Sequence, residues 1–126
     1  MPHCFVIITN GTPADWGVTI AGASVDFRHH DGTTENDTNN NANLSSGQST
    51  TLRSQNNCVV HQHVVLRVLV DGDTQLFDRQ YETPAGRCAT ENRVVLGPAA
   101  NITSRTPGQK IEEFLQVSSA EKDDDR

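Results

Sequence analysis

A long alternation of apolar and polar residues between positions 59 and 70 sets the strongest limit on how this chain can fold. One parity is apolar except at Gln62, and its apolar members are Val60, Val64, Leu66, Val68 and Val70. The other parity mixes valine and leucine with two histidines and an arginine. A period of two with many β-branched residues is typical of a strand that is buried on one face and mixed on the other. We therefore expect a central strand over residues 59–70, with Val60, Val64, Leu66 and Val68 in the core.

Shorter strand patterns and turn signals occupy much of the remaining chain. Strands are expected over residues 4–9, 18–27, 74–81 and 92–96, with weaker signals over 44–54 and, as a strand or a short helix, over 110–117. The pairs Asn10-Gly11, Asp31-Gly32 and Asp71-Gly72 are typical of tight turns. Short strands separated by turns, without a convincing long helix, predict an all-β fold of one domain, an antiparallel β-sandwich.

Two segments are too polar to predict a place in the sheets. Residues 33–43 are rich in Asn, Thr and Asp and carry almost no apolar residue, so we expect a solvated loop. Residues 118–126 are polar and acidic, so we expect a disordered tail. The predicted sandwich domain accordingly spans residues 1–117.

Length and charge narrow the classes of function. A chain of 126 residues is long enough for one domain with its own core. The net charge of −6 argues against nucleic acid as a partner and against strong attraction to anionic lipid surfaces. No signal peptide and no membrane-spanning run is visible, so we expect a protein that is cytoplasmic or secreted without a leader. Any association with a membrane is expected to be peripheral.

Cysteines and catalytic motifs give no indication of an enzyme. The cysteines are odd in number and widely spaced, at Cys4, Cys58 and Cys88. This pattern is not a disulfide framework, so we expect folding to need no disulfide. No nucleophile elbow and no glycine-rich phosphate loop is recognisable. We therefore expect a non-enzymatic protein without a cofactor.

Metal sites are weighed against simpler explanations. His61 and His63 project from one face of the predicted strand, and His29 and His30 occur elsewhere in the chain. Zinc requires three or four converging ligands, so we interpret these histidines as ordinary strand residues. The Asp71-Gly72-Asp73 segment lacks the pattern of a calcium loop and is interpreted as a hairpin turn.

Trp16 and Tyr81 are two of the few aromatic residues in the chain. Each lies close to proline and glycine, where a loop can present an aromatic side chain to a ligand. Each could equally cap one end of the sandwich core. The sequence leaves both interpretations open.

Two segments carry a family resemblance. The first joins the turn Asp71-Gly72-Asp73-Thr74 to a strand and then to the loop Gln80-Tyr81-Glu82-Thr83-Pro84-Ala85-Gly86. The second places Ser24 before Val25-Asp26-Phe27, with Asp31-Gly32 at a fixed distance downstream. With these motifs and the opening run Phe5 to Thr9, residues 4–96 resemble the aegerolysins. These are small, leaderless, acidic β-sandwich proteins of fungi and bacteria that bind membrane lipids.

The resemblance implies a ligand, a site and a partner. The ligand is a membrane lipid with a sphingolipid-type headgroup, and the partner is a separate pore-forming protein. The implied ligand-binding residues are Val25, Asp26, Phe27, Tyr81, Glu82, Thr83, Pro84, Ala85 and Gly86. The family has tryptophan where this chain has Val25, Tyr81 and Ala85, and cysteine where it has Thr83. Because so few aromatic residues remain, the competing hypothesis is a soluble lectin-like or protein-binding sandwich.

Overall fold

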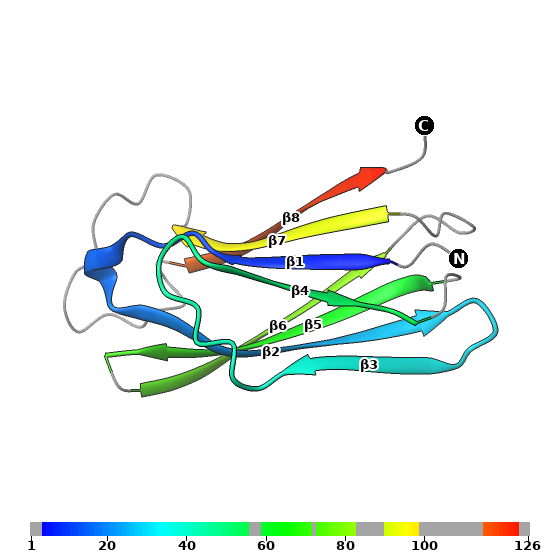
Figure 1. The fold of residues 1–126 in the computed structure, drawn as a ribbon, viewed down its shortest axis with the longest axis horizontal. Coiled ribbons are helices and arrows are strands. Elements are labelled where there is room, and N and C mark those ends of the chain that lie inside the picture. Colours follow the sequence, from blue (N-terminus) through cyan, green and yellow to red (C-terminus); the bar gives the residue numbers. More distant parts are fainter. Residues whose placement is uncertain (1–3, 56–58, 72, 83–89, 99–114, 124–126) are drawn as a thin grey trace.

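The computed structural model describes residues 4–55, 59–71, 73–82, 90–98 and 115–123, and most of them are in strands. The elements follow the order β1 (Phe5–Asn10), η1 (Ala14–Trp16), β2 (Val18–His29), β3 (Thr34–Asn39), β4 (Ser49–Arg53), β5 (Val59–Val70), β6 (Asp73–Glu82), β7 (Thr90–Pro98) and β8 (Leu115–Asp123). Two four-stranded sheets pack against each other, with strand orders β4-β1-β7-β8 and β3-β2-β5-β6 (Figure 1). The prediction of an all-β sandwich is confirmed.

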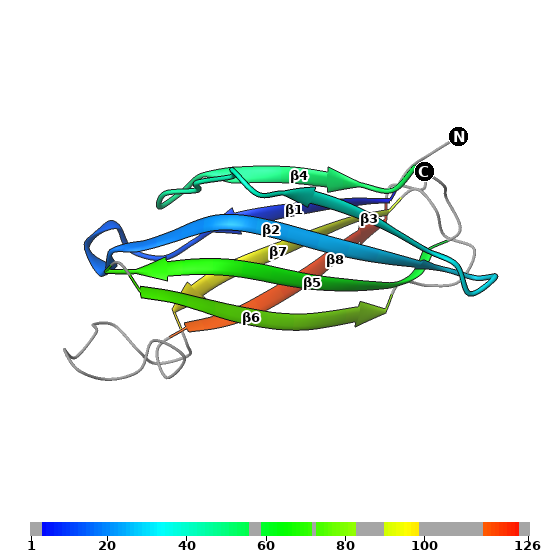
Figure 2. The same ribbon diagram turned by 90° about the horizontal axis from the view of Figure 1, so that it is seen from below.

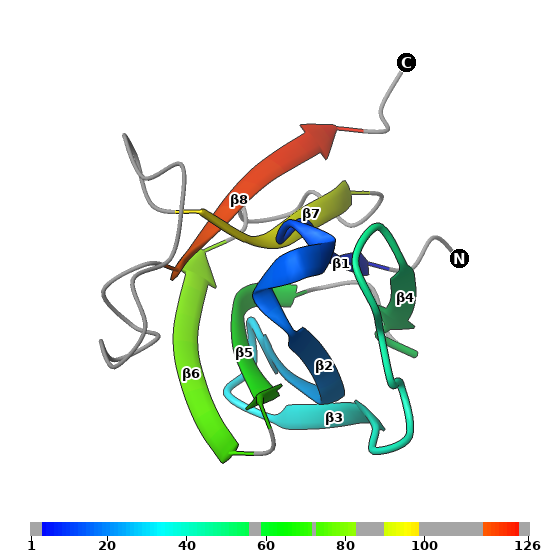
Figure 3. The same ribbon diagram turned by 90° about the vertical axis from the view of Figure 1, so that its left-hand side faces the viewer.

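Strand pairing is antiparallel throughout the described sheets except between β1 and β7, which run parallel. Seen from below, the strands β7 and β8 cross obliquely behind β2 and β5 (Figure 2). Seen from one end, β3 and β4 lie along one side of the sandwich, and β6 and β8 lie along the other (Figure 3).

Strand β5 occupies the predicted range, residues 59–70. Val64, Leu66 and Val68 are almost completely buried, as their parity predicts, whereas Val60 is half-buried. The polar member of this parity, Gln62, is fully buried as well and accepts a hydrogen bond from the side-chain amide of Asn92 on β7 in the opposite sheet. The alternation along β5 therefore marks the face that packs against the other sheet.

A bulge explains why the alternation along β2 is imperfect. The pairing of β2 with β5 shifts by one residue between Ile20 and Gly22. Ile20 and Ala23 therefore both face the core, although their parities differ. Beyond the bulge the alternation resumes, with Val25 and Phe27 fully buried.

The expected solvated loop over residues 33–43 is wrong for residues 34–39, which form β3 at the edge of its sheet. An edge strand pairs through its backbone with one neighbour and needs no apolar residues. The inward side chains of β3 instead bond to β4 of the other sheet and to Gln55, two residues after β4 ends. Glu35 accepts from the backbone N–H of Gln55 at 2.6 Å, and Asp37 accepts from that of Arg53 at 2.9 Å.

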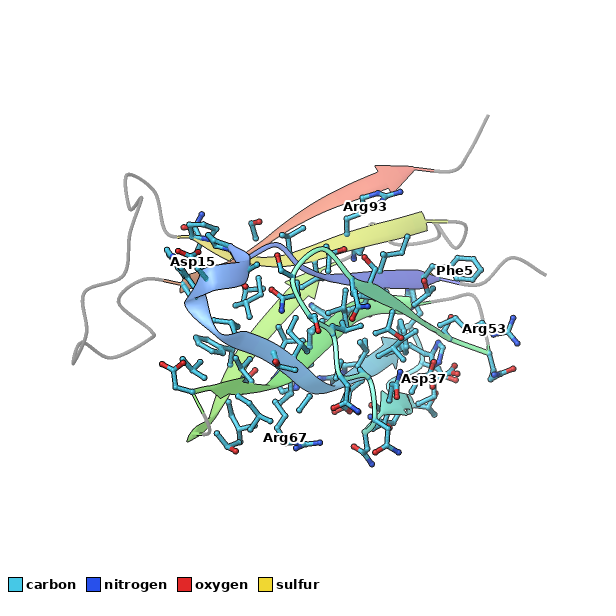
Figure 4. The ribbon with its side chains drawn as sticks, turned by 60° about the vertical axis from the view of Figure 1, so that its left-hand side comes forward. Phe5, Asp15, Asp37, Arg53, Arg67 and Arg93 are labelled. Atoms are coloured by element: carbon cyan, nitrogen blue, oxygen red, sulfur yellow. The ribbon has the colours of Figure 1, made fainter. Side chains whose placement is uncertain are left out.

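A third hydrogen bond joins the two edge strands, from the Asn39 amide to the Thr50 hydroxyl at 3.1 Å. We call these three side-chain bonds, made by Glu35, Asp37 and Asn39, the seam. Asp37 and Arg53 lie close together where β3 and β4 meet (Figure 4). Polar side chains thus satisfy backbone amides that an edge strand would otherwise leave open. The polar composition of residues 33–43 reflects this role.

The expected disordered tail is also wrong in part. Residues 118–123 continue β8 and pair with β7, from Ser118 opposite Val95 to Asp123 opposite Thr90. Pairing through the backbone places few demands on side-chain polarity, which explains why composition alone was misleading. The sandwich therefore extends past the predicted boundary at residue 117.

Candidate functional site

The first predicted segment, residues 25–27, is divided between the two faces of its sheet. Val25 and Phe27 are both fully buried in the core. Their side chains therefore cannot contact a ligand at the surface, contrary to the prediction from the resemblance. Asp26 lies between them, faces outward and keeps 48% of its side chain exposed. Strand alternation leaves Asp26 as the one accessible side chain of this segment.

The second predicted segment begins at the end of β6. Tyr81, predicted both to end the strand over residues 74–81 and to begin the loop, lies in the strand, and Glu82, expected in the loop, is the last residue of this strand. Through β5, the backbone of Tyr81 aligns with Gln62 and then with Phe27. The end of β6 and residues 25–27 therefore belong to the same end of one sheet, on the right in Figure 1. The remaining predicted residues, Thr83 to Gly86, lie outside the described part of the chain.

The outward side chains beside this end form a polar row across all four strands of the sheet, made of Asn36 on β3, Asp26 on β2, His63 on β5 and Asp78 on β6. The Asn36 amide donates to Asp26 Oδ1 at 2.8 Å. Asp26 Oδ2 lies 4.0 Å from His63 Nδ1, and His63 Nε2 contacts Asp78 Oδ1. We call these four residues the polar row.

Hydroxyl groups extend the polar row at its β3 end. Ser24 and Thr38 are hydrogen-bonded through their hydroxyls at 3.0 Å. Asn36 donates to the Ser24 hydroxyl at 2.8 Å and accepts from the Thr38 hydroxyl at 2.5 Å. The sheet thus presents hydroxyl, amide and carboxylate groups side by side, which is a chemistry suited to hydrogen-bonding or cationic ligands.

Among the described residues, Leu76 is the one large apolar residue with an exposed side chain. It points outward from β6, five residues before Tyr81. Trp16, which the sequence left between a binding role and a core role, is 4% exposed and belongs to the core cluster. The described surface is therefore polar rather than aromatic.

The histidines do not converge. His61 and His63 share a face of β5 as predicted, but His29 turns inward, is almost completely buried and contacts Glu35. His30 lies exposed in the turn after β2. Within the described residues, no group of three or more His, Cys, Asp or Glu side chains is arranged to hold a metal ion.

One carboxylate in the turn after β2 has a shifted pKa. Asp31 accepts from the Thr33 hydroxyl at 2.7 Å and from the Thr33 backbone N–H at 2.9 Å. These two bonds stabilise the ionised form and lower the pKa of Asp31 below its ordinary value of 3.8. Gly32 adopts a φ of 89°, which confirms the tight turn predicted from the Asp31-Gly32 pair.

Cys4 is buried at the start of β1, and its backbone N–H donates to the Ser54 hydroxyl at 3.0 Å. Cys58 and Cys88 lie outside the described residues, so the expectation about disulfides stays a prediction.

Comparison with known proteins gives no match for this chain among protein-family models, curated proteins or solved structures. The described part of the chain also contains no helix with the length and apolar character needed to cross a membrane.

Proposed function

We propose that this protein is a non-enzymatic binding protein that recognises the polar headgroup of a membrane lipid. The observation that carries the proposal is the location of the polar row. Its outward carboxylates, Asp26 and Asp78, lie on β2, which contains residues 24–27 of the resemblance, and on β6, which contains residues 80–82 of it.

The chemistry of the polar row favours one class of headgroup. Zwitterionic headgroups, including those of the sphingolipid type, combine a cationic amine with a phosphate, and carboxylates can pair with the amine. An anionic lipid surface would instead be repelled by the net charge of −6. We therefore propose a zwitterionic target and peripheral attachment to the membrane.

The proposal assigns membrane damage to a second protein. Deep insertion into a bilayer requires exposed apolar area, and Leu76 alone supplies a large apolar side chain among the exposed residues that the structure describes. A lipid-recognising component with a separate pore-forming partner fits this surface better than a protein that perforates membranes alone. Purified protein should therefore bind liposomes without releasing an enclosed dye.

Sedimentation with liposomes tests the proposal, using sphingomyelin, phosphatidylcholine and anionic vesicles in parallel. If Tyr81 is the aromatic contact, Tyr81→Ala should weaken binding roughly thirtyfold, since such an anchor contributes about 2 kcal/mol. Tyr81→Phe is the matched control and separates the ring from its hydroxyl. Raising the salt concentration should change the affinity little, because the proposed site pairs one or two carboxylates with the headgroup and does not follow lipid phosphates with a row of basic residues.

A soluble recognition module is the second candidate. The hydrogen-bonded group of Ser24, Asn36 and Thr38 favours it, because hydroxyl and amide groups also recognise sugars. A glycan array with the wild-type protein distinguishes the two functions. If the protein ignores every liposome but retains a glycan, or if Tyr81→Ala binds lipid as well as wild type, the lipid proposal is rejected.

A further inference from the structure

The side-chain contacts of His63 extend to both neighbouring strands. His63 lies on β5, between β2 and β6 in the sheet. Its Nε2 contacts Asp78 Oδ1 on β6, and its Nδ1 lies 4.0 Å from Asp26 Oδ2 on β2. Asn36 donates to the other oxygen of Asp26 and so helps to fix the orientation of that carboxylate. Each ring nitrogen of His63 therefore faces a carboxylate from a different strand.

A neutral imidazole can donate to only one of these two carboxylates. It carries one N–H, and its second nitrogen is an acceptor that faces an acceptor-only carboxylate. A protonated imidazolium carries an N–H at both nitrogens and a positive charge, so it attracts Asp26 across 4.0 Å as well as Asp78. The charge of the His63 ring therefore decides whether this side chain attracts the carboxylate of one neighbouring strand or those of both.

The strand tied by Asp78 is at the edge of its sheet. Among the described strands, β6 pairs with β5 and has no other neighbour in the sheet order. The β3 edge differs, because the side-chain seam to β4 holds it. The last residues of β6, Tyr81 and Glu82, lead directly into residues 83–86, where the resemblance places the ligand-binding loop.

We propose that His63 is a pH-operated clasp that fastens the edge strand β6 to β2 when its ring is protonated. Loss of the proton removes the charge attraction between the ring and both carboxylates and leaves one N–H for the two of them, so the contact that holds the end of β6 weakens. The other charged groups nearby are Arg28 on β2 and His61 on β5, one row closer to the sheet end, and His61 is in register with Glu82 of β6.

Amide hydrogen exchange tests the clasp in the absence of any lipid. Protection factors for residues 76–82, corrected for the intrinsic pH dependence of exchange, are compared at pH 5.5 and pH 8. In wild type they should be roughly two- to fivefold higher at pH 5.5, the effect of an exposed ion pair. His63→Gln should remove this difference, because glutamine does not titrate. Asp78→Asn should reduce it.

His61→Gln is the matched control, because it removes the neighbouring histidine on the same face of β5 and keeps His63. This variant should retain the pH-dependent protection of β6. Equal protection at both pH values in wild type, or an unchanged pH dependence in His63→Gln, would overturn the clasp. Thermal melts of each variant verify that it is folded.

The pH dependence of β6 protection does not require lipid binding. Only the effect of the clasp on ligand binding rests on the proposed function. Liposome sedimentation at both pH values makes that link visible. If hydrogen exchange depends on pH as expected but the protein binds no liposome, the proposed function is rejected and the clasp is still supported. Binding that is independent of pH while exchange responds to pH rejects the link between them.

Discussion

The inner and outer faces of β2 and β5 are built from alternating residues of the same strands, yet they differ in almost every respect. Val25, Phe27 and Val64 face inward and are fully buried. Asp26 and His63 face outward, and each keeps more than a third of its side chain exposed. A segment that a family resemblance treats as one unit, residues 25–27, is thus divided by the pleat into core and surface. A binding role can fall only on its outward member.

The two faces also differ in what they contribute to stability. Burial of apolar area contributes about 25 cal/mol per Å², so a buried valine or leucine contributes roughly 1.5–3 kcal/mol. Exposed ion pairs and hydrogen bonds such as those of the polar row contribute about 1 kcal/mol or less each. The inner face therefore supplies most of the stability of the fold, and residues of the outer face can be used for binding at little cost in stability.

The largest effect is expected from placing a carboxylate on the inner face. Val64→Asp buries a charge without a partner and should lower the free energy of unfolding by about 3 kcal/mol or more. Val65→Asp, one residue further along β5, changes the outer face and should cost no more than about 1 kcal/mol, mostly by repulsion from Asp78 opposite it. Urea unfolding of both variants measures the contrast. Equal losses of stability would show that the assignment of the faces is wrong.

Buried polar residues sharpen the comparison. Asn10 is fully buried, donates to the carbonyls of Val18 and Leu44 at 3.0 and 2.9 Å, and accepts from the N–H and hydroxyl of Thr12 at 3.1 and 2.6 Å. Asn10→Ala leaves these groups without partners away from water and should cost about 2–4 kcal/mol. Asn36→Ala removes a comparable set of bonds at the surface and should cost less than about 1 kcal/mol, since water replaces them. Thermal or urea unfolding distinguishes the two, and a smaller loss for Asn10→Ala would contradict the structure.

The sequence predicted the inner face well because its signal is local. The alternation over residues 59–70 is sufficient to identify β5 and its buried parity. Residues 34–39 and 118–123 were missed as strands, because edge strands need backbone pairing more than apolar side chains. The alternation of apolar residues along β2 is interrupted by the bulge between Ile20 and Gly22, which the sequence pattern alone does not reveal.

The outer face was harder to predict because it depends on register between strands. The resemblance named Asp26, and the spacing of His61 and His63 placed both on one face. Asp78 is on the strand that the predicted hairpin joins to β5, but nothing in the sequence shows that Asp26 lies on the other side of His63, since β2 and β5 are far apart in the chain. Side chains that hydrogen-bond to one another across a sheet produce no periodic pattern in the sequence, whereas buried apolar side chains do.

The smallest effect is expected at Asp31, in the fully exposed turn after β2. The pKa of Asp31 is lower in the folded protein than in the unfolded chain, so its charge stabilises the fold above the unfolded pKa, and this contribution is lost as the pH falls through the folded pKa. Asp31→Asn retains an oxygen that can accept from Thr33 but removes the charge. Its thermal midpoint should therefore fall slightly below that of wild type at pH 7, and the difference should disappear as the pH falls through the lowered pKa of Asp31.

Asp31→Ala is the matched control for this smallest effect, because it removes the acceptor as well as the charge. Its deficit should persist at low pH, where a protonated aspartate can still accept from Thr33 through its carbonyl oxygen. A deficit of Asp31→Asn that grew on acidification would reverse the sign of the linkage and contradict the lowered pKa. If the two variants instead follow these pH profiles, one part of the stability of the turn comes from the charge of Asp31 and another part from its hydrogen bonds to Thr33. Such a division is expected of a polar residue on the outer surface.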